Sequence, residues 1–191
     1  MRSPEYDTVQ QAQLLDIAYA SIEHGLQRGA PLLPALERLH ATLAAQRASF
    51  VSLHRHGELR GCIGSLQASK PLAEDVAYSA FQAAFRDPRF PPLSPLEFAT
   101  LDIEVSVLSP LEKLTVVDER ELLAAIEPGV DGLVLEDTHR RATFLPVVWQ
   151  SLPSPTAFLE HLKEKGGWPY DYWASDMRVY RYHTETFKRT I

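Results

Sequence analysis

Cysteine is almost absent from this chain of 191 residues, in which Cys62 is the only one. A single thiol excludes an internal disulfide, and it also excludes a four-cysteine zinc site or an iron–sulfur cluster held by this chain alone. Such cysteine usage is typical of a reducing compartment, so we expect a cytoplasmic protein. A chain of this length buries enough surface to fold without cross-links.

Long apolar runs and an excess of positive charge are missing too. No apolar run approaches the roughly 20 residues that a membrane-spanning helix needs, so we expect no membrane anchoring. The 19 basic residues are outnumbered by 25 acidic ones, which gives a net charge of −6. Nucleic-acid binding needs a basic surface that neutralises phosphates, and this balance argues against nucleic acid as the partner.

Motifs for metals and nucleotides are also missing. None of the seven histidines forms a helically spaced pair beside a carboxylate, so no metal site is predicted. The segment Gly61–Gly64 is not a Gly-x-Gly-x-x-Gly loop, and no P-loop lysine follows it. Backbone N–H groups beside these glycines could still cradle an anion. These patterns leave the cofactor unknown.

Apolar periodicity predicts a mixture of helices and strands. Helices are expected at residues 8–26, 71–85, 119–126 and 155–165. Strands are expected at residues 49–54, 59–64, 100–108, 133–135, 142–145 and 177–187, whereas residues 35–47 are ambiguous. Because hairpins dominate the strand pairing, we predict an α+β fold with a mainly antiparallel sheet and flanking helices. The length favours a single domain over residues 1–191, with room for two lobes.

The second strand of the first hairpin holds the most distinctive segment, Leu59-Arg60-Gly61-Cys62-Ile63-Gly64. Two glycines in so short a strand predict a bulge or a close backbone approach. On a regular strand, Arg60 and Cys62 point to the same face, and Glu104 lies on the polar face of strand 100–108. If these two faces meet, the three side chains form one polar cluster.

This cluster is the candidate catalytic site. A thiolate nucleophile needs a neighbouring cation, and a base or orienting carboxylate completes such a site. We therefore assign the roles of nucleophile to Cys62, of base or orienting group to Glu104, and of anion binder to Arg60. The alternative is a structural, buried cysteine beside a plain cross-strand ion pair between Arg60 and Glu104.

Five further residues are candidates for ligand binding: Gly61, Gly64, Asp87, Arg89 and His54. His54 could approach Cys62 across the hairpin. Three prolines stiffen the loop after Phe85, so its charged residues could close over the cluster. The alternatives are that the two glycines serve packing, that Asp87 and Arg89 form a local ion pair, and that His54 is an exposed hairpin residue.

The segment Leu59–Gly64 resembles the six-residue signature of the AMMECR family, whose bacterial members are called AmmeMemoRadiSam system protein A. Three further blocks resemble the family in the same order, at residues 83–93, 101–109 and 131–166. The resemblance implies a two-lobed α+β fold and work alongside Memo-like and radical-SAM proteins. It supplies no reaction, cofactor or oligomeric state.

Three functions stay open at this point. The first is an enzyme, or the accessory subunit of an enzyme, with its site around Cys62. The second is a non-catalytic binding or adaptor module that docks a partner through its C-terminal aromatic residues, which otherwise pack the last strand onto the body. The third is RNA or nucleotide binding, which requires a local basic groove. The aromatic residues in question are Trp168, Tyr170, Tyr172, Trp173, Tyr180 and Tyr182.

Overall fold

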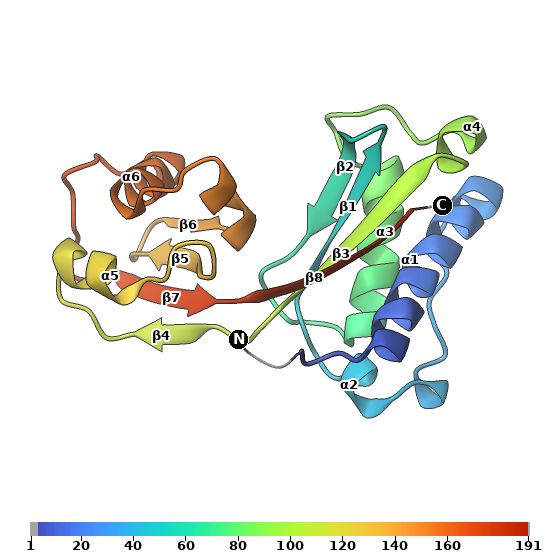
Figure 1. The fold of residues 1–191 in the computed structure, drawn as a ribbon, viewed down its shortest axis with the longest axis horizontal. Helices are drawn as coiled ribbons and strands as arrows, with labels where there is room; N and C mark the ends of the chain where they lie inside the picture. The colour runs from blue at the N-terminus through green and yellow to red at the C-terminus, as the bar shows by residue number, and fades with distance from the viewer. Residues whose placement is uncertain (1–3, 191) are drawn as a thin grey trace. The chain divides into compact units, whose positions relative to one another are not determined.

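The computed structural model describes residues 4–190, which form two compact units (Figure 1). Unit 1 consists of residues 4–108 and 185–190, and unit 2 consists of residues 109–184. Each unit combines helices with a four-stranded sheet whose strand pairs are antiparallel, which confirms the predicted α+β fold. Within residues 4–190, no helix combines the length and the apolar character needed to cross a membrane.

The sheet of unit 1 has the strand order β2-β1-β3-β8. Its strands are β1 (Ser49–Arg55), β2 (Glu58–Gly64), β3 (Leu101–Leu108) and β8 (Thr184–Thr190). The turn between β1 and β2 places His56 and Gly57 at φ of 53° and 82°. Two successive residues with positive φ are typical of the tight hairpin turn that the sequence predicts here. The strand β2 lies at one edge of this sheet.

Two helices, α1 (Thr8–Arg28) and α3 (Leu72–Phe85), cover one face of this sheet (Figure 1). Asp7 begins α1 by accepting the N–H of Gln10, and Gly29 ends it in the left-handed region at φ 69°. Three short helical segments complete unit 1: η1 (Leu36–Arg38), α2 (Ala41–Ala44) and α4 (Pro95–Phe98). The first two occupy the stretch that periodicity leaves ambiguous.

The two faces of this sheet differ in chemistry because its strands alternate. The helix-covered face supplies buried side chains to the core of unit 1, namely Val51, Leu53, Leu101, Ile103, Val105, Val107 and Phe187. The opposite face, called the polar face below, carries Phe50, Ser52, His54, Asp102, Glu104, Ser106 and Thr186. The predicted place of Glu104 on the polar face of strand 100–108 is thereby confirmed.

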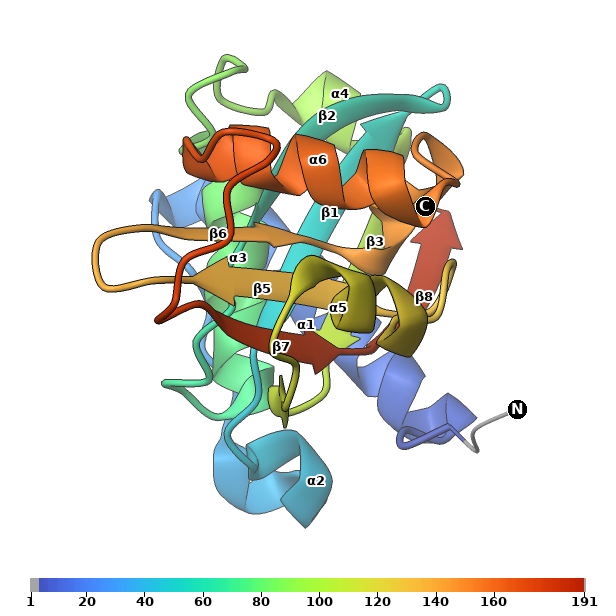
Figure 2. The ribbon, with the colours of Figure 1, turned by 90° about the vertical axis from the view of Figure 1, so that its left-hand side faces the viewer.

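Unit 2 has its own sheet, of order β4-β7-β5-β6, and its own core. Its strands are β4 (Glu112–Leu114), β5 (Gly132–Glu136), β6 (Arg141–Phe144) and β7 (Arg178–Tyr182). Its helices are α5 (Glu119–Ala125), η2 (Pro146–Gln150) and α6 (Pro155–Gly166). Figure 2 shows α6 running alongside β6. Trp149 stacks on Phe158 in this core, with ring centroids 3.8 Å apart.

The prediction of a single last strand over residues 177–187 is wrong. The chain forms two strands there, β7 and β8, which belong to different sheets. His183 separates them: its N–H donates to Ser109 Oγ, and its carbonyl accepts from the Ser109 N–H, both at 2.9 Å. Alternation shows that a segment is extended, but it does not show which neighbour the segment pairs with.

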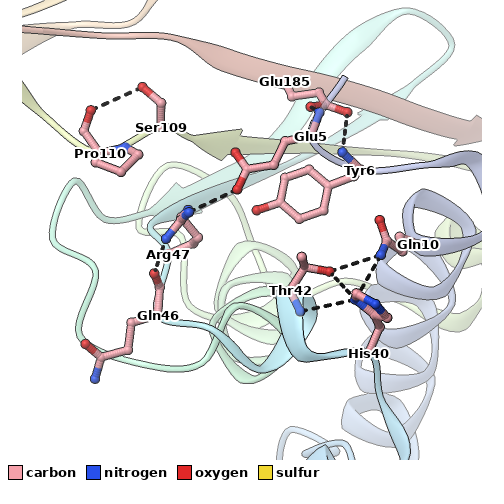
Figure 3. A network of polar contacts seen from close by, with 10 residues as sticks. All are labelled: Glu5, Tyr6, Gln10, His40, Thr42, Gln46, Arg47, Ser109, Pro110 and Glu185. Carbon is pink, nitrogen blue, oxygen red and sulfur yellow. Dashed lines mark hydrogen bonds and ion pairs between the residues drawn. The ribbon is translucent and has the colours of Figure 1, made fainter. Parts of the chain in front are cut away.

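The first described residues of unit 1 are bound to its last strand (Figure 3). The backbone N–H groups of Glu5 and Tyr6 donate to the Glu185 carboxylate at 2.8 and 3.3 Å. Arg47 pairs with the Glu5 carboxylate at 3.0 Å. The Tyr6 ring is only 1% exposed, and this burial raises the pKa of Tyr6 to about 12. Glu5 is therefore bound to a residue 180 positions later in the sequence.

Candidate functional site

Three side chains form a row across the polar face of unit 1. In the strand register, Ser52 lies opposite Cys62 on β2 and opposite Glu104 on β3. The Ser52 hydroxyl donates a hydrogen bond to Cys62 Sγ at 3.2 Å. Side chains at such register positions have Cβ atoms roughly 4.5–5.5 Å apart, so thiol, hydroxyl and carboxylate are neighbours. Cys62 and Glu104 thus lie on one face of the sheet, but their strands are separated by β1, and Ser52 lies between them.

The Cys62 backbone points away from β1, toward the loop that follows α3. Its N–H donates to Asp87 Oδ2 at 2.9 Å, and its carbonyl accepts from Arg89 at 3.3 Å. Because these groups face outward, Cys62 and Ser52 are a pair without mutual backbone hydrogen bonds, the geometry in which side chains lie closest. This geometry explains how the Ser52 hydroxyl reaches the sulfur.

Asp87 is the centre of this clamp on the edge strand. Its carboxylate also accepts from the backbone N–H of Arg89 at 3.1 Å and from the Arg89 guanidinium at 3.0 and 2.7 Å. Asp87 is only 4% exposed. The Arg89 guanidinium, helped by the N–H groups of Cys62 and Arg89, holds the pKa of Asp87 well below its usual range despite burial. The carboxylate is therefore a permanent anion that stabilises the strand.

The placement predicted for Arg60 is wrong. Its guanidinium binds the Glu97 carboxylate of α4 at 2.8 and 3.2 Å and the Pro91 carbonyl at 2.8 Å. It also lies 5.7 Å from the centre of the Phe90 ring. The predicted partner Glu104 is not among these contacts. Arg60 is 8% exposed, so it ties the loop to β2 instead of completing the thiol cluster.

A β-bulge explains this difference. Leu53 pairs with Gly61, but the next residue, His54, pairs with Leu59, so Arg60 is an extra residue on β2. An extra residue breaks the two-residue alternation on which the common face of Arg60 and Cys62 depends. The two glycines indicate a bulge in the sequence, but they do not show that Arg60 is its extra residue.

The two glycines of the signature lie where a side chain has no room. A Cβ on Gly61 would come within 2.2 Å of the Ala83 carbonyl oxygen of α3, and one on Gly64 within 2.2 Å of the Ser49 carbonyl oxygen. The predicted close backbone approach is therefore found at both positions. Binding of a ligand by either glycine stays a prediction.

His54 is not the residue that faces the thiol. Its register partners are Leu59 on β2 and Asp102 on β3, whereas Ser52 lies opposite Cys62. The expected Cys–His arrangement is thus replaced by a Cys–Ser contact. His54 lies two residues after Ser52 on β1 and shares the polar face with it. Its role in ligand binding stays a prediction.

Sequence reasoning missed Ser52 and Glu97. Glu97 binds Arg60, and it also closes a capping box with Ser94 at the start of α4. The Arg60 guanidinium and the Ser94 N–H lower the pKa of Glu97 to about 2. The pattern Ser94-Pro95-Leu96-Glu97 is a helix-start signature that indicates this short helix and its fixed carboxylate.

The arrangement suits nucleophilic or proton-transfer chemistry. The row combines a thiol, a hydroxyl that donates to it, and a carboxylate on the next strand. The thiol is half-buried and free. Within residues 4–190, no group of three or more His, Cys, Asp and Glu side chains is placed to hold a metal ion.

Comparison with known proteins gives consistent matches. The AMMECR1 family model matches residues 15–187. A protein of Methanothermobacter thermautotrophicus is 38% identical over 180 residues, covering 91% of either chain. A protein of Methanopyrus kandleri is 37% identical over 186 residues, covering 92% of this chain and 86% of the relative. The crystal structure of an uncharacterised protein from Pyrococcus horikoshii superposes with a TM-score of 0.81 at 33% identity, covering 92% and 89% of the two chains.

Proposed function

Because the chain belongs to the AMMECR1 family, we propose that it acts as an enzyme, or as the accessory subunit of one, whose reactive group is the Cys62 thiol. Its partners are Memo-like and radical-SAM proteins, as the resemblance to the AmmeMemoRadiSam system implies. The setting is the cytoplasm, where a lone thiol stays reduced.

The observation that supports this proposal is that both the backbone and the sulfur of Cys62 are held by neighbouring residues. The clamp of Asp87 and Arg89 fixes its backbone, and the Ser52 hydroxyl approaches its sulfur at 3.2 Å. Catalytic groups need such restraint, because a reacting atom must be held within about 0.5 Å of its productive position. A half-buried thiol on a rigid edge strand meets this condition while keeping a path to solvent.

Each residue of the row has a distinct part in the proposed chemistry. Cys62 supplies the nucleophile as its thiolate, since the thiol form attacks poorly. Ser52 donates its hydroxyl to the sulfur, and a hydrogen bond to a charged acceptor is stronger than one to a neutral acceptor. Glu104, on the far side of Ser52, is the base or orienting carboxylate. Arg60 is assigned to the support of the loop.

Turnover in a reconstituted system of the three proteins tests the proposal. We expect Cys62→Ser to lower turnover at least about 100-fold, because an unactivated hydroxyl is a far weaker nucleophile than a thiolate. The matched control is Ser106→Ala, which alters the polar face away from the thiol, at a hydroxyl bonded to Thr186. Circular dichroism and the urea midpoint of each variant establish that the fold is intact. Unchanged turnover in folded Cys62→Ser would refute the thiol as the reactive group.

A second candidate function, a protein-binding module, is supported by a different observation. Two tyrosines of unit 2, Tyr170 and Tyr172, expose 72% and 43% of their surface. Exposed aromatic side chains on an ordered segment are typical of binding surfaces. Binding through this surface is compatible with a reactive Cys62, because the two features involve different residues.

A further inference from the structure

The segment 167–176 of unit 2, called the aromatic segment below, divides its rings between core and surface. Trp168 is 3% exposed and Trp173 is partly buried, and both pack in the core of unit 2. Tyr170 is 72% exposed and Tyr172 is 43% exposed. The predicted packing role therefore holds for the two tryptophans, whereas the two tyrosines lie at the surface.

The hairpin between β5 and β6 holds both ends of the aromatic segment. At its start, Trp168 Nε1 donates to Asp137 Oδ2 at 2.7 Å, and Arg140 donates to the Gly167 carbonyl at 2.6 Å. At its end, the backbone N–H of Thr138 donates to Asp176 Oδ2 at 2.9 Å. Side-chain and backbone groups of one turn thus fix a loop of ten residues.

A buried lysine holds the middle of the segment. Lys163 of α6 is completely buried, and its ammonium donates to the Tyr170 carbonyl and binds the Glu119 carboxylate of α5. Removing an ammonium from water is costly unless it is paired and hydrogen-bonded, and both partners are supplied here. The backbone beneath Tyr170 is therefore tied to two helices while its ring stays exposed.

The charge of the segment indicates what it binds. Residues 167–176 contain four aromatic residues and the carboxylates of Asp171 and Asp176, but no lysine, arginine or histidine. Asp176 is engaged by Thr138, whereas Asp171 lies exposed between the two tyrosines. The segment itself offers nucleic-acid phosphates two carboxylates and no cation, and the cations that touch it, Arg140 and Lys163, are bound to its backbone carbonyls. This argues against an RNA ligand.

We propose that Tyr170, Asp171 and Tyr172 form a docking site for an arginine side chain of a protein partner. A guanidinium is planar and cationic, so it stacks on an aromatic face and binds a carboxylate in the same arrangement. The clamps described above order the segment before binding, which lowers the entropy cost of docking. The site is independent of Cys62, so it stands whether or not the thiol is reactive.

Backbone amide NMR on the full chain tests the site, with an acetylated and amidated peptide Gly-Arg-Gly-Arg-Gly as the probe. At an ionic strength of about 0.15 M, we expect saturable shifts at residues 170–173. We expect binding to weaken about tenfold when lysine replaces both arginines of the peptide. Tyr170→Ala and Asp171→Asn should each weaken binding of the arginine peptide by a similar factor.

Two controls separate the docking site from general effects. Tyr170→Phe keeps the ring and should bind like the unaltered chain. Tyr78→Ala removes a tyrosine of unit 1 that is 41% exposed, close to the 43% of Tyr172, and should also bind normally. Equal binding by Tyr170→Ala, equal binding of the lysine peptide, or shifts that map elsewhere would each overturn the proposal. Binding of a uridine hexanucleotide at these amides, in place of the peptide, would overturn it in favour of nucleic acid.

Discussion

The Asp87 carboxylate accepts the backbone N–H of Cys62 at 2.9 Å, and through this bond a loop covers the exposed edge of a sheet. An edge strand presents unpaired N–H and C=O groups that would otherwise pair with another chain. Arg89 satisfies the carbonyl of the same residue at 3.3 Å. The signature strand is therefore protected at the position of its thiol.

Removing the charge of Asp87 should loosen this clamp. We expect Asp87→Asn to lower the free energy of unfolding by about 2 kcal/mol, because the amide loses the charged pairing with the half-exposed Arg89. Urea unfolding at pH 7 measures the change. Asp102→Asn, on the polar face, is the matched control and should change stability by less than about 0.5 kcal/mol. Equal effects of the two variants would show that the clamp contributes nothing special.

Stability should fall in acid partly through Glu97. Its pKa is lowered to about 2 in the folded chain, against about 4.3 for an unfolded chain. The carboxylate therefore stabilises the fold fully above about pH 4.3, and this contribution is lost as the pH falls toward 2. The difference in urea midpoint between the unaltered chain and Glu97→Gln should accordingly be large at pH 7 and small near pH 2. A difference that stays constant over this pH range would contradict the ion pair with Arg60.

An alanine at Gly61 should disrupt the packing of β2 on α3. Its Cβ would lie 2.2 Å from a backbone oxygen of Ala83, which cannot rotate away as a side chain can. We expect a loss of about 3 kcal/mol, in line with overpacking of a core. Gly57→Ala is the comparison: its Cβ meets nothing within 4 Å, and only its φ of 82° carries a cost of about 1–2 kcal/mol. Thermal unfolding should rank the two variants in this order; the reverse order would refute the close approach.

Ser52 should govern the reactivity of the thiol. We expect Ser52→Ala to slow the reaction of Cys62 with a chromogenic disulfide reagent about tenfold at pH 7, because the thiolate loses a hydrogen-bond donor. Because Cys62 is the only cysteine, the signal belongs to one site. Ser106→Ala, on the same face, should leave the rate unchanged. A faster reaction in Ser52→Ala would show that the hydroxyl shields the sulfur more than it activates it.

The sequence predicts the elements around the site well and their contacts less well. The hairpin of β1 and β2 and the strand β3 begin and end within one residue of the predicted bounds, since alternation and turn residues are local signals. The common face of Cys62 and Glu104 also follows from alternation, but the strand β1 between them does not. The partner of Arg60 does not, because one extra residue in β2 changes the direction of that side chain.

The end of the chain shows a second limit of sequence reasoning. A continuous run of alternating residues around His183 gives no sign that the hydrogen-bond partners change there. The sheet that a strand joins depends on residues distant in sequence. One of these is Ser109, which binds His183 although 74 positions separate the two residues. The alternation of side chains indicates that a segment is extended, whereas its pairing with distant segments depends on the whole fold.

The order of strands in unit 1 has a consequence for synthesis on the ribosome. Unit 2 is inserted between residues 108 and 185, so β8 is made only after the whole of unit 2. Until then, β3 presents an unpaired edge and Glu185 is not available to the N–H groups of Glu5 and Tyr6. Domains generally fold as units during synthesis. The nascent chain can therefore complete unit 2 first, and the thiol-bearing unit closes only after unit 2 has been made.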